Sequence, residues 1–183
     1  MAAVAQQAVP AATWNFDPVH SHVGFEVTHN VSSTFRGTFG EIDATLDTTG
    51  ATPRIEGSAK VASVDVKDEN LSGHLQSPDF FDAERHPEIR FVADDVTIGE
   101  NGEATVRGEI TLKGVTKPLE ARGSLNYIAQ DIAGGERIAL ELDATIDRTD
   151  FGVSWNAPLG EGKYVLGNDV RILAGVQFTK AAA

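Results

Sequence analysis

Three of the five histidines of this chain lie in one short stretch, DPVHSHVGFEVTH, from Asp17 to His29. His20 and His22 are two residues apart, and together with Glu26 they offer the nitrogen and oxygen ligands that zinc accepts in proteins. A zinc site also needs a third ligand, an open coordination position and partners that orient the ligands. Only Asp17 is close enough in sequence to help, so a strand without any metal is the competing interpretation.

The spacing of the histidines favours the strand. Neighbouring side chains of an extended strand point to opposite faces, so His20 and His22 share one face. The opposite face carries the apolar residues and the last histidine: Val23, Phe25, Val27 and His29. We therefore predict no metal site, and we expect His29 to point inward, either as a hydrogen-bonded core residue or as the polar group that orients a ligand.

Other common chemistries find little support in the sequence. The chain has no cysteine, which excludes disulfides and thiolate catalysis. It contains neither a GxSxG elbow nor a GxGxxG or phosphate-binding loop, and no carboxylate pair stands out among 27 acidic residues. A formal net charge of −12 without a basic cluster argues against nucleic acid as a partner. We predict no catalytic residue, no cofactor and no enzymatic activity.

Alternation of apolar and polar residues dominates the chain from Trp14 onward and predicts antiparallel strands with one buried face. The pattern is clearest in four runs. Their inward residues are Ala104, Val106, Gly108, Ile110 and Leu112; Leu119, Ala121, Gly123, Leu125 and Tyr127; Ile138, Leu140, Leu142, Ala144 and Ile146; and Val170, Ile172, Ala174, Val176 and Phe178.

Further stretches near residues 19–29, 35–47, 54–66 and 88–98 bring the expected total to about eight strands. Residues 35–47 and 88–98 each change phase once, which is typical of a β-bulge. One short helix is expected near residues 68–77, with Asp68 as its cap and Pro78 ending it. The predicted fold class is all-β, an eight-stranded antiparallel β-barrel with a short helical insert; a sandwich is the alternative.

The inward face combines phenylalanines with small residues, which describes an elongated apolar slot. The small inward residues are Gly57, Ala59, Gly108, Ala121, Gly123, Ala144 and Ala174. Either bulky residues of opposite strands fill this volume, or it holds an apolar ligand. For the second case, the expected ligand-binding residues are Phe25, Val27, His29, Phe35, Phe39, Phe80, Phe81, Phe91, Ala121 and Leu125.

The barrel domain is expected to span residues 14–180, preceded by a flexible tail over residues 1–13. No apolar run is long enough to span a membrane. Ala3, Val4 and Ala5 are similar to the small residues at the end of an export signal, although the charged and apolar regions of such a signal are missing. The tail is therefore either a remnant of export or an Ala-rich extension.

Four stretches of the sequence resemble the YceI family, lipocalin-like barrels described as polyisoprenoid-binding proteins. They are WNFDPVHSHVGFEVTHNVSSTFRGTFGEID at 14–43, LSGHLQSPDFFDAERHPEIRF at 71–91, GEITLKGVTKPLEA at 108–121 and IDRTDFGV at 146–153. The resemblance covers Trp14 to about Phe178, with His20, His29, His74 and Asp79–Phe81 at family positions. His86 departs from it, since members commonly have an aromatic residue before this proline, and this puts ligand choice in doubt if the ring lines the tunnel mouth.

The resemblance implies an amphiphilic ligand in the tunnel, frequent homodimers and, in most bacterial members, a periplasmic location; a cytoplasmic one is the alternative. We expect a protein that binds, carries or stores a long-chain isoprenoid or fatty amphiphile. Two alternatives stay open: an enzyme that uses a His20/His22 metal or a His29 base on a bound lipid, and a stress-protective protein whose acidic surface recruits a partner.

Overall fold

The computed structural model describes residues 8–182 of the chain and contains twelve strands, one α-helix and two 3-10 turns. The strands near the two chain ends are the longest. The elements in chain order are β1 (Thr13–His29), β2 (Ser33–Phe39), β3 (Ile42–Asp47), β4 (Arg54–Lys60), η1 (Val61–Ser63), β5 (Val64–Asp65), α1 (Glu69–Gln76), β6 (Glu88–Ile98), β7 (Glu103–Leu112), β8 (Val115–Ile128), β9 (Arg137–Asp147), η2 (Arg148–Phe151), β10 (Pro158–Gly160), β11 (Lys163–Tyr164) and β12 (Leu166–Lys180).

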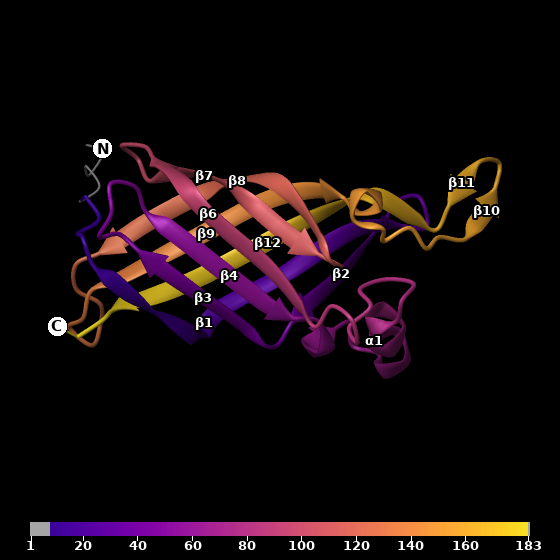
Figure 1. Ribbon diagram of the computed structural model, residues 1–183, viewed down its shortest axis with the longest axis horizontal. Helices are drawn as coiled ribbons and strands as arrows, with labels where there is room; N and C mark the ends of the chain where they lie inside the picture. Colours follow the sequence, from indigo (N-terminus) through magenta and orange to yellow (C-terminus); the bar gives the residue numbers. More distant parts are fainter. Residues whose placement is uncertain (1–7, 183) are drawn as a thin grey trace.

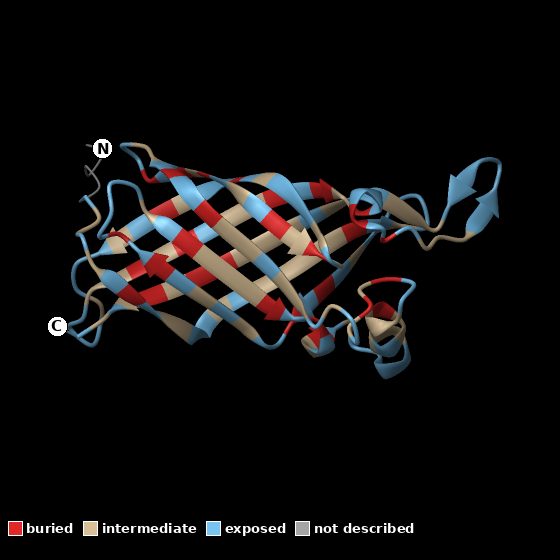
Figure 2. Ribbon diagram, in the orientation of Figure 1, coloured by how far each residue is buried: buried red, intermediate tan, exposed pale blue. Residues whose placement is uncertain are grey.

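The long strands close into an elongated barrel because β12 pairs with β9 on one side and with β1 on the other (Figure 1). All strand pairs are antiparallel, and buried and exposed residues alternate along them (Figure 2). β2 and β3 act as one bent strand beside β1, interrupted at Gly40 and Glu41. The eight-stranded barrel predicted from the sequence is confirmed, and the sandwich is excluded.

Two of the strands predicted from the alternation can be compared with the observed ones in detail. The phase change in residues 88–98 is confirmed as a register shift between Ala93 and Asp95 of β6. The single strand expected over residues 54–66 is wrong beyond Lys60, where the chain turns through η1. β5 then pairs with β2 instead, Val64 lying opposite Phe39.

β1 contains a bulge that the sequence did not indicate. Asp17 lies opposite Gln177 of β12, whereas His22 lies opposite Gly175, so five steps along β1 match two along β12. His20 lies inside this bulge, and both His20 and His22 are exposed. The two histidines therefore lie outside the barrel, as their parity predicts.

The barrel end that carries both termini is filled with side chains, and we call it the filled end. Phe178 and Leu46 are completely buried there, beside Trp14 at 2% exposure. The Trp14 indole donates a hydrogen bond of 2.9 Å to the Thr48 hydroxyl, which also accepts from the backbone N–H of Ala12. Ala12, near the end of the predicted tail, is thus hydrogen-bonded to the filled end, whereas residues 1–7 of that tail lie outside the described chain.

Two of the inward glycines have a different role from the one expected. A Cβ atom at Gly123 would lie 1.8 Å from the carbonyl oxygen of Glu141, and one at Gly108 would lie 2.1 Å from that of Val92. Both clashes are with the backbone of the neighbouring strand. These glycines allow close strand approach and do not create internal space.

An ion pair holds the bulge of β1 across the seam of the barrel. The Arg137 guanidinium on β9 donates to the Asp17 carboxylate and, at 3.1 Å, to the side-chain oxygen of Gln177 on β12. The His20 ring also contacts the Asp17 carboxylate, at 2.8 Å. The side chains of Asp17 and Arg137 are 14% and 18% exposed. The hydrogen bonds, first from Arg137 and then from His20, lower the pKa of Asp17 from its ordinary 3.8 to about 2.

We expect Asp17→Asn to lower the free energy of unfolding by about 2 kcal/mol at pH 7, as follows from a carboxyl pKa that is lower in the folded state. Because the folded pKa lies below the unfolded one, this stabilisation is complete above pH 4 and is lost as the pH falls towards 2. Urea unfolding of parent and variant from pH 7 to pH 2.5 measures the difference.

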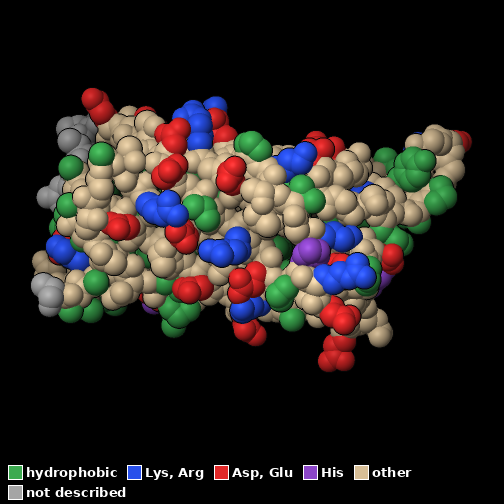
Figure 3. Space-filling model, in the orientation of Figure 1, with side chains coloured by type: hydrophobic (Ala, Val, Ile, Leu, Met, Phe, Trp, Pro, Cys, Tyr) green, Lys and Arg blue, Asp and Glu red, His purple; other side chains and the backbone are tan. Residues whose placement is uncertain are grey.

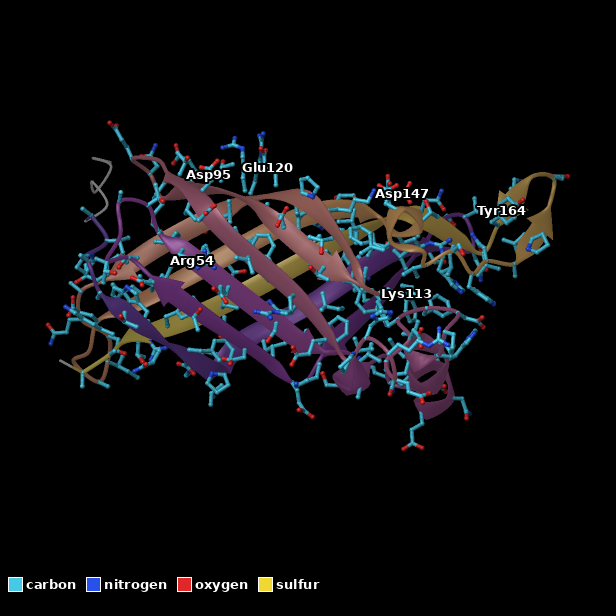
Figure 4. All side chains as sticks on the ribbon, in the orientation of Figure 1. Arg54, Asp95, Lys113, Glu120, Asp147 and Tyr164 are labelled. Atoms are coloured by element: carbon cyan, nitrogen blue, oxygen red, sulfur yellow. The ribbon has the colours of Figure 1, made fainter. Side chains whose placement is uncertain are left out.

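The matched control is Glu120→Gln, which removes an exposed carboxylate paired with Arg107 and Arg122 on the outer surface. Glu120 and Asp95 project from the barrel in Figure 4, so the control is expected to stay close to the parent. A gap between Asp17→Asn and the parent that is equally large at pH 7 and pH 2.5 would contradict the role given to Asp17.

Candidate functional site

The barrel interior contains two apolar cavities that lie end to end. The outer cavity, of about 230 Å³, lies next to α1, and the inner cavity, of about 140 Å³, lies deeper in the barrel towards the filled end. Both are lined by the same five residues where they meet. These shared residues are Val23, Ala59, Ile89, Ile110 and Ile172. The interior is therefore an elongated apolar slot that is closed at one end.

Small side chains create the inner cavity. On β3, β4, β8, β9 and β12 an alanine or glycine occupies an inward position where the filled end has larger residues. These lining residues are Ala44, Gly57, Ala59, Ala121, Ala144 and Ala174. Bulky residues of opposite strands therefore do not fill the space beside these small residues, and a cavity remains in this part of the barrel.

The insert between β5 and β6 covers the open end of the slot. The Asp68 carboxylate caps α1 by accepting a 2.8 Å hydrogen bond from the N–H of Leu71, and the helix ends at Gln76, before Pro78, as predicted. Leu71 and Leu75 of α1 both line the outer cavity. The two leucines, four residues apart on one side of α1, thus lie over the open end of the slot, which we call the mouth.

One lysine fixes this cover to the barrel rim. Lys113, in the turn between β7 and β8, donates hydrogen bonds from Nζ to the carbonyls of Pro78 (2.6 Å) and Gly152 (3.2 Å). In Figure 4, Lys113 lies at the barrel end from which the insert leaves. Phe81 of the insert reaches back to the barrel, with its ring 5.9 Å from Phe39 and 6.3 Å from Phe25.

A second aromatic cluster, formed by His74, Phe80 and Trp155, lies at the covered end of the slot. The His74 ring contacts Phe80 and Trp155 edge-on, at centroid distances of 5.0 and 5.2 Å. Its Nε2 atom is 2.9 Å from the Asp79 carboxylate, which fixes the ring orientation. All three rings line the outer cavity.

His29 points inward, as its parity predicts, and lines the outer cavity beside Phe35 at a centroid distance of 6.1 Å. Within residues 8–182 its ring has no hydrogen-bond partner, and because His29 lines the cavity, a ligand there could supply one. The three polar side chains of the outer cavity are His29, His74 and Arg148; every other lining residue is apolar or glycine.

Most of the residues proposed from the sequence line this slot. Seven line the outer cavity: Phe25, Val27, His29, Phe35, Phe39, Phe80 and Phe81. Phe91 and Ala121 line the inner one. Leu125 lines neither cavity, because it lies at the filled end with no exposed surface, and we withdraw it as a ligand contact.

Sequence reasoning missed Arg148 and Trp155, which belong to the irregular segment after β9. Arg148 continues the inward parity of β9, since it lies two residues after the inward Ile146, so the alternation contained a usable signal for it. Trp155 lies outside any strand, so the alternation gave no signal for it. His86 lines neither cavity and packs against Gly114.

No cluster of three or more metal-ligating side chains occurs among the residues that the structure describes. Outside the barrel, acidic and basic side chains are interspersed over the visible face (Figure 3). In the same described part of the chain, no helix is long and apolar enough to cross a bilayer.

Comparison with known proteins finds a family model described as a YceI-like domain, which matches residues 14–178. A UPF0312 protein from Pseudomonas savastanoi is 32% identical over 145 residues, covering 78% of this chain and 76% of that protein. Similar curated proteins occur in Staphylococcus epidermidis, at 29% identity over 91% of this chain and 96% of the relative.

Two solved structures show the same fold at low sequence identity. BcnA from Burkholderia cenocepacia has a TM-score of 0.74 at 20% identity, covering 89% of this chain and 99% of that one. A polyisoprenoid binding domain from Saccharophagus degradans, implicated in plant cell wall breakdown, has a TM-score of 0.70 at 14% identity, covering 94% and 100%.

Removal of the helix cap should loosen the cover of the outer cavity. We expect Asp68→Ala to cost α1 about 1 kcal/mol, as other N-cap replacements do, and to accelerate amide exchange in residues 69–76 about fivefold. Hydrogen–deuterium exchange with mass spectrometry gives the rate for each segment. The control Asp47→Ala removes a similar aspartate hydrogen bond, to the N–H of Thr49 in a turn at the filled end, and should leave exchange in α1 unchanged.

Proposed function

Because the chain belongs to the YceI-like domain family, we propose that it binds a long-chain apolar or amphiphilic lipid, of the polyisoprenoid type, inside the barrel. The observation that carries this proposal is the pair of cavities lying end to end, with a mostly apolar wall from the mouth under α1 to the filled end. An elongated slot fits a flexible chain better than a compact molecule.

Burial of the chain supplies the binding free energy. Each CH₂ group moved out of water contributes about 0.8 kcal/mol, so a stretch of about ten carbons gives on the order of 8 kcal/mol before the costs of association. Carriage or storage of a lipid therefore needs no extensive polar recognition. The lining supports binding over catalysis, because the outer cavity holds only His29, His74 and Arg148 as polar side chains.

Two further properties remain predictions of the family resemblance: homodimer formation and export to the periplasm. Neither one is needed for the binding proposal, which rests on the interior of a single barrel. The polyisoprenoid binding domain of Saccharophagus degradans shares this fold, and its ligand class supports the choice of a prenyl chain as the first ligand to test.

The inner cavity should set the length of chain that the protein accepts. Ala121 is 4% exposed and lines that cavity, so Ala121→Trp should fill it while leaving the outer cavity open. Excluding about four CH₂ groups would weaken binding of a long prenol such as solanesol on the order of 100-fold, with geraniol little affected. Native mass spectrometry of the protein titrated with each prenol measures both affinities.

Arg122→Trp is the control, because Arg122 is the next residue on β8 and faces solvent. Ala121→Leu gives a smaller step in volume, and circular dichroism checks that each variant folds. If the parent protein binds neither solanesol nor geraniol, the proposed function is wrong. If Ala121→Trp and Arg122→Trp weaken solanesol equally, the chain does not reach the inner cavity.

The two tryptophans should report ligand binding differently. Trp155 lines the outer cavity, whereas Trp14 is buried at the filled end and hydrogen-bonded to Thr48. A prenol entering the mouth should therefore change the fluorescence of the parent and of Trp14→Phe, and should leave that of Trp155→Phe unchanged. A response that persists in Trp155→Phe and disappears in Trp14→Phe would place the ligand elsewhere.

A further inference from the structure

Arg148 is a charged side chain buried in the wall of an apolar cavity. It follows β9 as the first residue of η2, is 4% exposed, and lines the outer cavity with Trp155 and His74. A buried guanidinium is costly unless hydrogen bonds and a nearby negative charge compensate for the lost water. The groups around Arg148 supply the hydrogen bonds, but no carboxylate of the described chain forms an ion pair with it.

Backbone carbonyls satisfy three of its five N–H groups. Nε donates to the carbonyl of Gly167 at 2.8 Å, and Nη1 donates to those of Val153 and Trp155 at 2.7 and 2.9 Å. The third nitrogen, Nη2, has no acceptor within residues 8–182. No side-chain nitrogen of this part of the chain is both fully buried and unpartnered, so Nη2 keeps some accessible surface. Arg148 itself is one of the residues that line the outer cavity.

The charge of Arg148 also lacks a paired carboxylate in the described chain. The neighbouring Asp147 carboxylate accepts instead from the N–H and the hydroxyl of Thr149, at 2.8 and 2.6 Å. Burial lowers the pKa of Arg148, which the field of Asp147 only partly offsets, although a guanidinium stays charged at neutral pH. Arg137 shows the contrast, since it is paired with both Asp17 and Asp131.

We propose that Arg148, through the free N–H groups of Nη2, binds an anionic oxygen-bearing head group, a phosphate or a carboxylate, of the lipid whose chain occupies the slot. The two free N–H groups of Nη2 can each donate a charge-assisted hydrogen bond to an anionic oxygen, which both of these head groups provide. This inference rests on the proposed function and adds the chemistry of the ligand's head. The head then lies at the covered mouth, and the chain extends towards the inner cavity.

The test compares lipids that differ only in the head group. Farnesol, farnesyl monophosphate and farnesoic acid are titrated against the intact parent protein by isothermal calorimetry. The parent is expected to bind at least one of the two anions about tenfold or more tightly than farnesol, the size of one charge-assisted hydrogen bond. The comparison of phosphate with carboxylate identifies the preferred head.

Arg148→Gln should remove this preference while farnesol affinity stays within about threefold. Arg148→Lys, which keeps the charge but has three N–H donors in place of five, should retain only part of it. Arg171→Gln is the control for net charge, because Arg171 is exposed on the outside of β12. If Arg148 only holds backbone segments together, Arg148→Gln would instead bind all three lipids equally poorly, and the inference would be wrong.

The parent protein alone can overturn the inference, even if no Arg148 variant folds. Binding of farnesol as tightly as both anions would leave the proposed function standing and exclude an anion-binding role for Arg148. Failure of the parent to bind farnesol, either anion and every longer prenol would instead remove the proposed function, and this inference with it.

Discussion

The pairing of β1 with β12 is the interaction on which the rest of this structure depends. It joins the two ends of the sheet, Phe25 lying opposite Ile172 and Trp14 opposite Lys180, so the sheet becomes a closed wall. Without this seam, the inward residues of all the strands would face water, and neither cavity would exist. The bulge in β1 is tolerated there because the side chains of Asp17 and Arg137 bridge the three strands involved.

Within the closed wall, side-chain size decides which part is core and which part is empty. Trp14, Leu46 and Phe178 fill the end that carries the termini, and alanines such as Ala144 and Ala174 leave space in the middle. The mouth is covered by an insert that Asp68 and Lys113 hold in place. One barrel therefore provides its own stability at one end and an apolar slot at the other.

Period-two alternation predicted the fold and most of the slot, because it reports which face of a strand is buried. It does not report how far along the barrel a residue lies. Ala121 and Leu125 have the same parity on β8, yet one lines the inner cavity and the other lies in the filled end. Their depth depends on strand register and tilt, which come from long-range pairing.

Irregular segments were the other limit of the prediction. Trp155 reaches the mouth from a segment without regular structure, where no periodicity applies. Arg148 could have been predicted, because the alternation of β9 extended to residue 148 places a charged side chain inward. Such a conflict between residue type and position is typical of functional sites.

The seam between β1 and β12 also has a consequence for how the barrel folds. These strands are the first and last of the barrel, so their contacts bridge almost the whole described chain and are slow to form. A chain whose other strands pair first would expose a sheet with an apolar inner face and two unpaired edges to other chains until this seam forms. The formal charge of −12 is useful during this interval, since like-charged chains repel one another before their edges can pair.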